Sequence, residues 1–174
     1  MKKTVTLIMI LLLTASTLMA GDFVSRFMGL IADDSKPLNN VNIGKKMLVK
    51  MSDEIEDKDL AKMFHNLNSI RIITCDDIQD SRFYFNKAND FLKENYSDYD
   101  EIVSVNDQKN KINTVLKKEN NNTDIILISL DEEGKLSIIN VSGKIDLDSF
   151  SKLSNNINDK KLTSTEDSLT QKEK

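Results

Sequence analysis

The 174-residue chain has little of the chemistry on which most enzyme and metal sites depend. It contains one cysteine, one histidine, five glycines and no tryptophan. A single cysteine cannot form an internal disulfide, so no disulfide framework holds this fold. One histidine and one cysteine cannot make a zinc or copper site unless carboxylates from elsewhere complete the ligand set. With so few glycines, the sequence also has no phosphate-binding loop and no Gly-x-Ser-x-Gly nucleophile elbow.

The isolated thiol allows three interpretations. Cys75 follows the β-rich segment 69–74, and an unpaired cysteine at such a place commonly packs as a small buried hydrophobe. We therefore predict buried packing, with an intermolecular disulfide and a catalytic thiol as the alternatives. Catalysis would need the only histidine, His65, as its base. His65 lies in a segment with helical periodicity, where a surface or partly packed imidazole is expected.

Acidic residues outnumber basic ones. The chain has 24 Lys and Arg against 28 Asp and Glu, which gives a net charge of −4. Because its basic residues form no dense stripe, nucleic acid is not expected as a partner. Acids cluster in residues 53–57, 76–80 and 131–133, but none of these clusters has the spacing of an EF-hand loop. We expect them to cap helices and form turns.

The first twenty residues have the pattern of an export signal. Lysines at positions 2 and 3 precede an uncharged stretch that ends at Ala20, and its apolar centre is short for a membrane span. We predict that residues 1–20 are a signal peptide removed after Ala20, with retention as an anchor as the alternative. Gly21 stands where a bacterial lipoprotein would carry its acylated cysteine. The mature protein is therefore expected in the periplasm or outside the cell, without stable membrane insertion.

Removal of this signal leaves a more acidic chain of one domain. The signal holds two lysines and no acid, so 22 basic residues remain against 28 acidic ones, a net charge of −6. The remaining 154 residues suffice for one hydrophobic core. We assign this domain to residues 21–157. Residues 158–174 are polar, with two leucines as their only apolar residues, and are predicted to be a disordered tail.

Hydrophobic periodicity predicts helices and strands in separate parts of the domain. We expect helices over residues 23–31, 44–51, 57–67 and 80–96, and strands over residues 69–75, 99–105, 111–117, 124–130 and 135–142. Phe150, Leu153 and Ile157 predict a last short helix that covers the sheet. Tight turns join the last four strands, which favours antiparallel pairing. The sequence therefore predicts an α+β fold, with a mostly antiparallel sheet of about five strands and helices packed on one face.

Three segments carry a resemblance to a known family. They are Val-Asn-Ile-Gly-Lys-Lys-Met-Leu at residues 41–48, Ile-Arg-Ile-Ile-Thr at residues 70–74, and Ile-Ile-Asn-Val-Ser-Gly-Lys-Ile-Asp-Leu at residues 138–147. With these segments the chain resembles the domain-of-unknown-function family 4252, a group of small exported bacterial proteins, from about residue 23 to residue 153. The resemblance implies an exported envelope protein without an established activity, and it transfers no catalytic residues.

Two classes of function are expected from these observations. The first is a non-enzymatic binding or structural accessory module of the cell envelope, which binds another envelope protein through a sheet edge or an apolar helix face. No catalytic, cofactor-binding or metal-binding residue is predicted. The alternative is a small-molecule binder or enzyme whose site is assembled from scattered acids, lysines and tyrosines such as Tyr84, Tyr96 and Tyr99. A broad apolar surface patch would favour the first class, and a deep cavity beside Asp76, Asp77 or Cys75 would favour the second.

Overall fold

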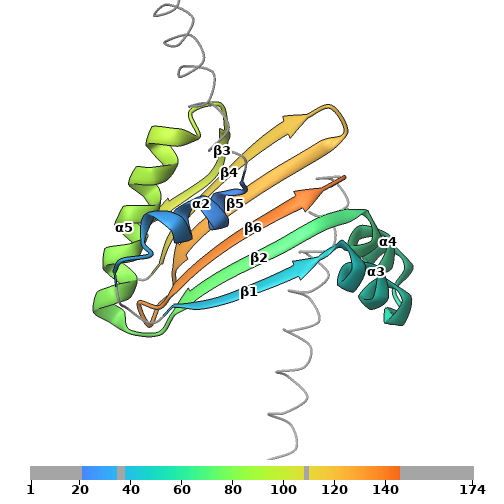
Figure 1. Cartoon of the computed structure of the whole chain (residues 1–174), viewed down its shortest axis with the longest axis horizontal. Coiled ribbons are helices and arrows are strands. Elements are labelled where there is room, and N and C mark those ends of the chain that lie inside the picture. Colours follow the sequence, from blue (N-terminus) through green and yellow to red (C-terminus); the bar gives the residue numbers. More distant parts are fainter. Residues whose placement is uncertain (1–20, 35–37, 108–109, 146–174) are drawn as a thin grey trace, which may run out of the picture.

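A six-stranded antiparallel sheet organises the fold. The computed structural model describes residues 21–34, 38–107 and 110–145. The strands lie in the order β1-β2-β6-β5-β4-β3, and each neighbouring pair is antiparallel (Figure 1). They are β1 (Asn39–Gly44), β2 (Leu67–Cys75), β3 (Asp100–Asn106), β4 (Lys111–Glu119), β5 (Asn122–Leu130) and β6 (Leu136–Gly143). The predicted α+β fold is confirmed, with six strands where about five were expected.

β1 is the strand that sequence periodicity does not reveal. Three of its six residues are asparagines, and all but one of its positions are exposed. Asparagine is depleted in strands, and an edge strand need not alternate between buried and exposed positions. The strand forms by pairing with β2 along its whole length. The helix expected from Gly44 begins at the next residue, Lys45, where β1 ends.

Four helices lie within the described residues. They are α2 (Phe23–Leu30), α3 (Lys45–Glu54), α4 (Lys58–Asn66) and α5 (Ile78–Asn95). Asp57 and Asp77 cap α4 and α5, because each carboxylate accepts hydrogen bonds of 2.9–3.0 Å from two backbone amides of its helix. Asp131 accepts two such bonds within the turn between β5 and β6. The last two acidic clusters thus supply a cap and a turn, and Asp57 supplies a cap from the first, as the sequence predicts.

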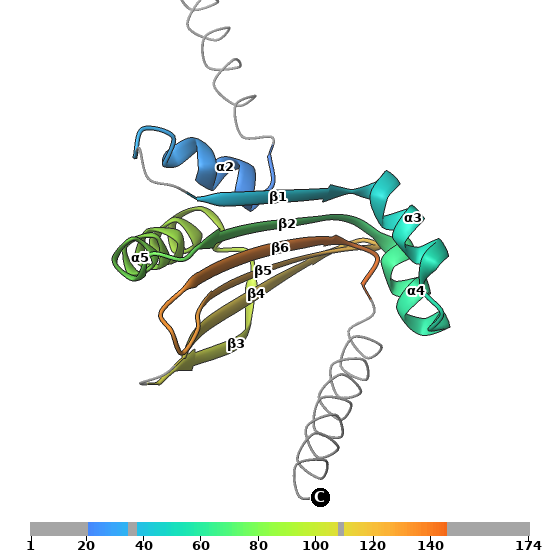
Figure 2. The ribbon, with the colours of Figure 1, turned by 90° about the horizontal axis from the view of Figure 1, so that it is seen from below.

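α2 and α5 cover one face of the sheet, which we call the covered face. Because side chains alternate along a strand, β2, β5 and β6 each place every second residue on it. Its strand residues Ile73, Ile126 and Ile138 are fully buried. The helices contribute Phe23, Val24 and Phe27 from α2 and Tyr84, Ala88 and Leu92 from α5. Figure 2 shows both helices on the same side of the sheet.

α3 and α4 lie beyond one end of the sheet and bury a second, smaller cluster (Figure 2). Leu48 of α3, Leu67 at the start of β2 and Ile145 after β6 form its buried centre. Partly buried apolar residues packed against it are Ile43, Phe64, Ile70, Ile125 and Val141. The strand residues among these point away from α2 and α5. The four described helices therefore do not all pack on the same face of the sheet. α2 and α5 cover one face, and α3 and α4 contact one end of the opposite face.

Several sequence predictions lie outside the described residues. They are the signal peptide at residues 1–20, the last helix with Phe150, Leu153 and Ile157, and the polar tail at residues 158–174. Over residues 21–34, 38–107 and 110–145, no helix is both long enough and apolar enough to cross a membrane.

Candidate functional site

The face of the sheet opposite α2 and α5 is also apolar, and we call it the open face. The pairing register places two aliphatic residues from each of the six strands on it. They are Val41, Ile43, Ile70, Ile72, Val103, Val105, Ile112, Leu116, Ile125, Leu127, Ile139 and Val141. Leu116 is buried, whereas Val41 and Val103 are 49% and 44% exposed and the other nine residues are partly buried.

This second apolar face is unusual for an antiparallel sheet. Such sheets commonly bury one face and present polar side chains to water on the other. Within the described part of the chain, the helices that reach the open face are α3 and α4, at the end formed by β1, β2 and β6. Contiguous apolar surface of this kind usually marks a place where something else binds.

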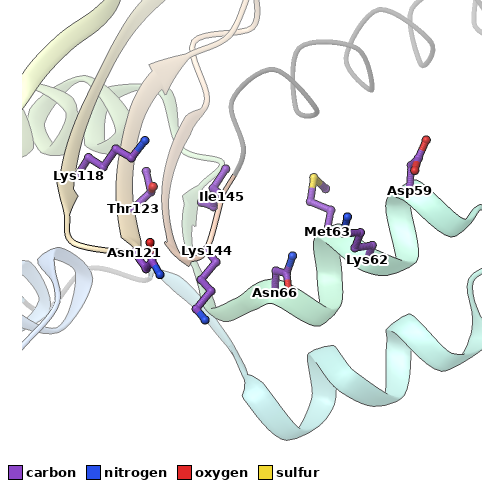
Figure 3. Close-up of a pocket in the computed structure, with 9 residues that line it drawn as sticks. All are labelled: Asp59, Lys62, Met63, Asn66, Lys118, Asn121, Thr123, Lys144 and Ile145. Atoms are coloured by element: carbon purple, nitrogen blue, oxygen red, sulfur yellow. The ribbon is translucent and has the colours of Figure 1, made fainter.

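A groove lies at that end of the open face. It has a volume of about 480 Å³, and its walls come from α4 on one side and from the β4–β5 hairpin and the end of β6 on the other (Figure 3). α4 contributes Asp59, Lys62, Met63 and Asn66, the hairpin contributes Lys118, Asn121 and Thr123, and the segment after β6 contributes Lys144 and Ile145. The groove is thus a continuation of the open face, because Thr123 and Lys118 share the face of Ile125 and Leu116.

Backbone contacts hold α4 against β6 and so fix the width of the groove. The amide of Lys144 donates to the carbonyl of Asn66 at 3.0 Å, which joins the end of β6 to the end of α4. Separately, the Lys45 side chain at the start of α3 donates to the carbonyls of His65 and Leu67. Lysine is well suited to these carbonyls, because the last carbonyls of a helix have no partner within it. Gly143 permits this approach, since a Cβ there would stand 2.6 Å from the Leu67 Cα.

The groove is basic in an acidic protein. Among the described residues, Lys62, Lys118 and Lys144 line it together with one acid, Asp59, and these four side chains sum to a formal charge of +2. The apolar part of its lining is Met63 and Ile145. An occupant that combines a carboxylate with aliphatic side chains fits this lining, since each part would meet its complement.

The structure separates Cys75 from His65. Cys75 is buried at the end of β2, where its thiol donates to the carbonyl of Asp77 at 3.7 Å. His65 is exposed on α4, just before β2 begins. The nine-residue strand between them spans roughly 25 Å, so the two side chains cannot form a catalytic pair. The buried packing predicted for Cys75 is confirmed.

The three tyrosines belong to the covered face. Tyr84 belongs to α5 and is buried, and the rings of Tyr96 and Tyr99 meet edge to face at 5.2 Å. The Tyr99 hydroxyl donates to Asp124 at 2.6 Å, and the other Asp124 oxygen accepts from the Asn140 amide at 2.6 Å. Burial first, and then this bond to a carboxylate, raise the pKa of Tyr99 well above its usual range. These tyrosines stabilise the core and lie away from the groove.

The described residues contain no candidate metal site. Across the described ranges, no group of three His, Cys, Asp or Glu side chains is placed to hold a metal ion. A smaller cavity of about 300 Å³ adjoins the β5–β6 turn, lined by acids such as Glu132 and Glu133 and by the cations Arg82 and Lys111. The groove beside α4 is the larger of the two and is continuous with the open face.

The family of the chain follows from a match over most of its length. The family model described as domain of unknown function DUF4252 matches residues 33–153, well over half of the 174 residues. The chain belongs to the DUF4252 family. Neither a curated protein nor a solved structure matches it. The DUF4252 match includes all six strands, the open face and every residue of the groove. It begins after α2, the helix that closes part of the covered face.

The groove is the part of the site that sequence reasoning missed. Its lysines stand at positions 62, 118 and 144, and nothing in their spacing indicates that the fold brings them together. The open face does leave a signal in the DUF4252 sequence. Consecutive apolar residues at 125–128 and at 138–139 are typical of strands that are buried on both faces.

Proposed function

We propose that the protein is an exported, non-enzymatic binding module of the cell envelope, and that its open face binds another envelope protein. Export is supported by the signal pattern of residues 1–20, with lysines at positions 2 and 3 and a small residue at position 20. Binding is supported by the open face itself. The DUF4252 family has no described function, so the proposal depends on this site and not on a relative.

One observation carries the proposal: each of the six strands contributes two aliphatic side chains to the open face. The helices α2 and α5 already bury the core of the domain on the other side of the sheet. Apolar residues on the open face are therefore in excess of what this core needs. A partner that covers them gains the free energy of removing apolar surface from water.

The groove gives the partner a chemical character. Its three lysines lie at one end of the open face, next to Met63 and Ile145. A protein segment with aliphatic side chains and a carboxylate near one end would match both regions. Charge complementarity of this kind contributes more to specificity and to the rate of association than to affinity.

The groove also supports a second candidate, a small-molecule binder. A volume of about 480 Å³ lies within the range of ligand pockets, roughly 300–1,000 Å³. A small organic acid with an apolar part would be its natural ligand. Such a ligand would fill the groove but leave most of the open face uncovered, which is why the protein partner is preferred.

Site-specific photocrosslinking in intact producing cells tests the first candidate. A photoreactive amino acid replaces Val41 on the open face, and Ile78 on α5 is the matched control because both side chains are 49% exposed. We expect one discrete crosslinked species from position 41 and none from position 78. A mature N-terminus at Gly21, read by mass spectrometry, is expected in the same sample. Equal crosslinking at both positions would overturn the binding assignment, and an intact Met1 would overturn cleavage of the signal.

A further inference from the structure

The chain leaves the described structure on the open face. Ile145, the last described residue, is only 8% exposed and forms a buried cluster with Leu48 and Leu67. Ile125 and Val141, both on the open face, pack against this cluster. The 29 residues that follow, from 146 to 174, therefore start beside the groove, on the side of the sheet opposite α2 and α5.

The first part of this continuation has an apolar stripe. Phe150, Leu153 and Ile157 are spaced three and four apart, so they would share one face of a helix. Over residues 158–174 the only apolar residues are Leu162 and Leu169. The apolar side chains of the continuation are thus concentrated within twelve residues of Ile145.

The length and the charge of residues 146–157 both match the open face and its groove. Ten residues from 148 to 157 would make a helix about 15 Å long, which spans about three strands at roughly 4.8 Å each. Asp146 and Asp148 come before the apolar stripe and so begin next to the groove. The groove beside Ile145 is lined by Lys62, Lys118 and Lys144, whose charge is opposite to that of these two acids, and opposite charges attract.

We propose that residues 146–157 of this chain dock on its own open face, with Asp146 and Asp148 at the lysines of the groove and Phe150, Leu153 and Ile157 on the aliphatic residues of the strands. The segment then occupies the surface that a partner needs. This last consequence rests on the proposed function, whereas the docking itself does not. A partner would bind by displacing the segment, so the segment lowers the affinity of the module for its partner.

Methyl NMR on the full mature chain tests the docking, with a neutral paramagnetic cosolute in the solvent to report methyl exposure. The test variant is Phe150→Ser combined with Leu153→Ser and Ile157→Ser. The matched control is Leu162→Ser combined with Leu169→Ser, which removes the two later apolar residues. The reporters are Ile125 and Ile139 on the open face, compared with Ile126 and Ile138 on the covered face.

We expect the cosolute effect on Ile125 and Ile139 to rise several-fold in the test variant and to stay unchanged in the control. Ile126 and Ile138 should be unaffected in both, which also shows that the fold is intact. Equal exposure of Ile125 and Ile139 in all three proteins would overturn the docking. Shielding that disappears on dilution of the unmodified protein would overturn it in favour of a second copy as the occupant.

The two proposals can fail separately. The NMR experiment contains no partner, so its outcome does not depend on crosslinking from Val41 in cells. If both hold, the crosslink from position 41 should become stronger in the triple serine variant, since the competing segment has left the face. A weaker crosslink there would contradict competition and leave the segment as part of the partner's binding surface.

Discussion

Ile138 and Ile139 are neighbours in β6, yet they differ in environment because they point to opposite faces of the sheet. Ile138 is fully buried beneath α2 and α5, whereas Ile139 is partly buried on the open face. The same contrast separates Ile126 from Ile125 in β5. Identical side chains on one strand thus have different roles. The helices above the sheet decide which face is core, and the residue types alone do not.

Truncating Ile138 and Ile139 to alanine should reveal the largest difference in stability between the two faces. Ile138→Ala removes three side-chain carbons from a fully buried site, and we expect it to cost about 4 kcal/mol of unfolding free energy. Ile139→Ala should cost less, about 2 kcal/mol, because its side chain is only partly buried. Urea unfolding followed by circular dichroism measures both values. Equal costs would mean that the open face is buried as deeply as the covered face.

The second prediction concerns the end of the open face, where β6 meets the start of β2. Gly143→Ala would place a Cβ 2.6 Å from the Leu67 Cα and 2.7 Å from the Asn66 carbonyl oxygen, both of which are backbone atoms. We expect a loss of about 3 kcal/mol, since backbone on either strand must move. Gly44→Ala is the matched control, because a Cβ there meets nothing within 4 Å.

The melting temperature of the two glycine variants provides the measurement. A control that loses as much stability as Gly143→Ala would show that the close contact is not the cause. If the melting temperature of Gly143→Ala were unchanged, α4 and β6 would not be held together as described, and the width of the groove would not be fixed.

A third prediction tests the buried hydrogen bonds that join α5 to the sheet on the covered face. The Ser81 hydroxyl is fully buried, donates to the Cys75 carbonyl at 2.8 Å and accepts from the Leu136 amide at 3.1 Å. Ser81→Ala should cost about 2 kcal/mol, because two buried backbone groups lose their partner. Ser104→Ala, at an exposed position of β3, should change stability by less than about 0.5 kcal/mol. Similar denaturation midpoints for the two variants would refute this role.

The smallest expected effect is on pH dependence, and it also belongs to the covered face. The pKa of Tyr99 is raised by burial and by its bond to Asp124, so the folded chain retains a proton that the unfolded chain releases near pH 10. Stability is therefore complete below about pH 10 and is lost as the pH rises above it. Because Tyr99 is only partly buried, we expect a loss below about 1 kcal/mol at pH 11.

Denaturant midpoints between about pH 8 and 11 measure this slope. In Tyr99→Phe the slope should become shallower, and at about pH 8, where Tyr99 is protonated, the loss of the Asp124 bond should lower stability. An unchanged slope in that variant would assign the effect to other groups, of which Tyr96 is the nearest candidate because burial also raises its pKa.

The comparison of the two faces also explains what the sequence could predict. α5 and the hairpins β3–β4 and β5–β6 were predicted because their apolar residues follow a local period. β1 was not, because it forms only through pairing with β2 and carries three asparagines. The groove depends on three distant segments, so local patterns do not contain it. Burial of Cys75 was predictable, since a cysteine at the end of an apolar strand seldom points to water.

The position of β6 between β2 and β5 has a consequence for the time at which the domain can fold. β6 is the last of the described strands in the sequence, and it joins the β1–β2 pair to the three strands β3, β4 and β5. The Ser69 and Ser142 hydroxyls meet at 2.8 Å across a separation of 73 positions. Contacts between such distant positions form late, because a long loop must close first. A growing polypeptide therefore holds two unjoined pieces of sheet until nearly the whole domain has been synthesised.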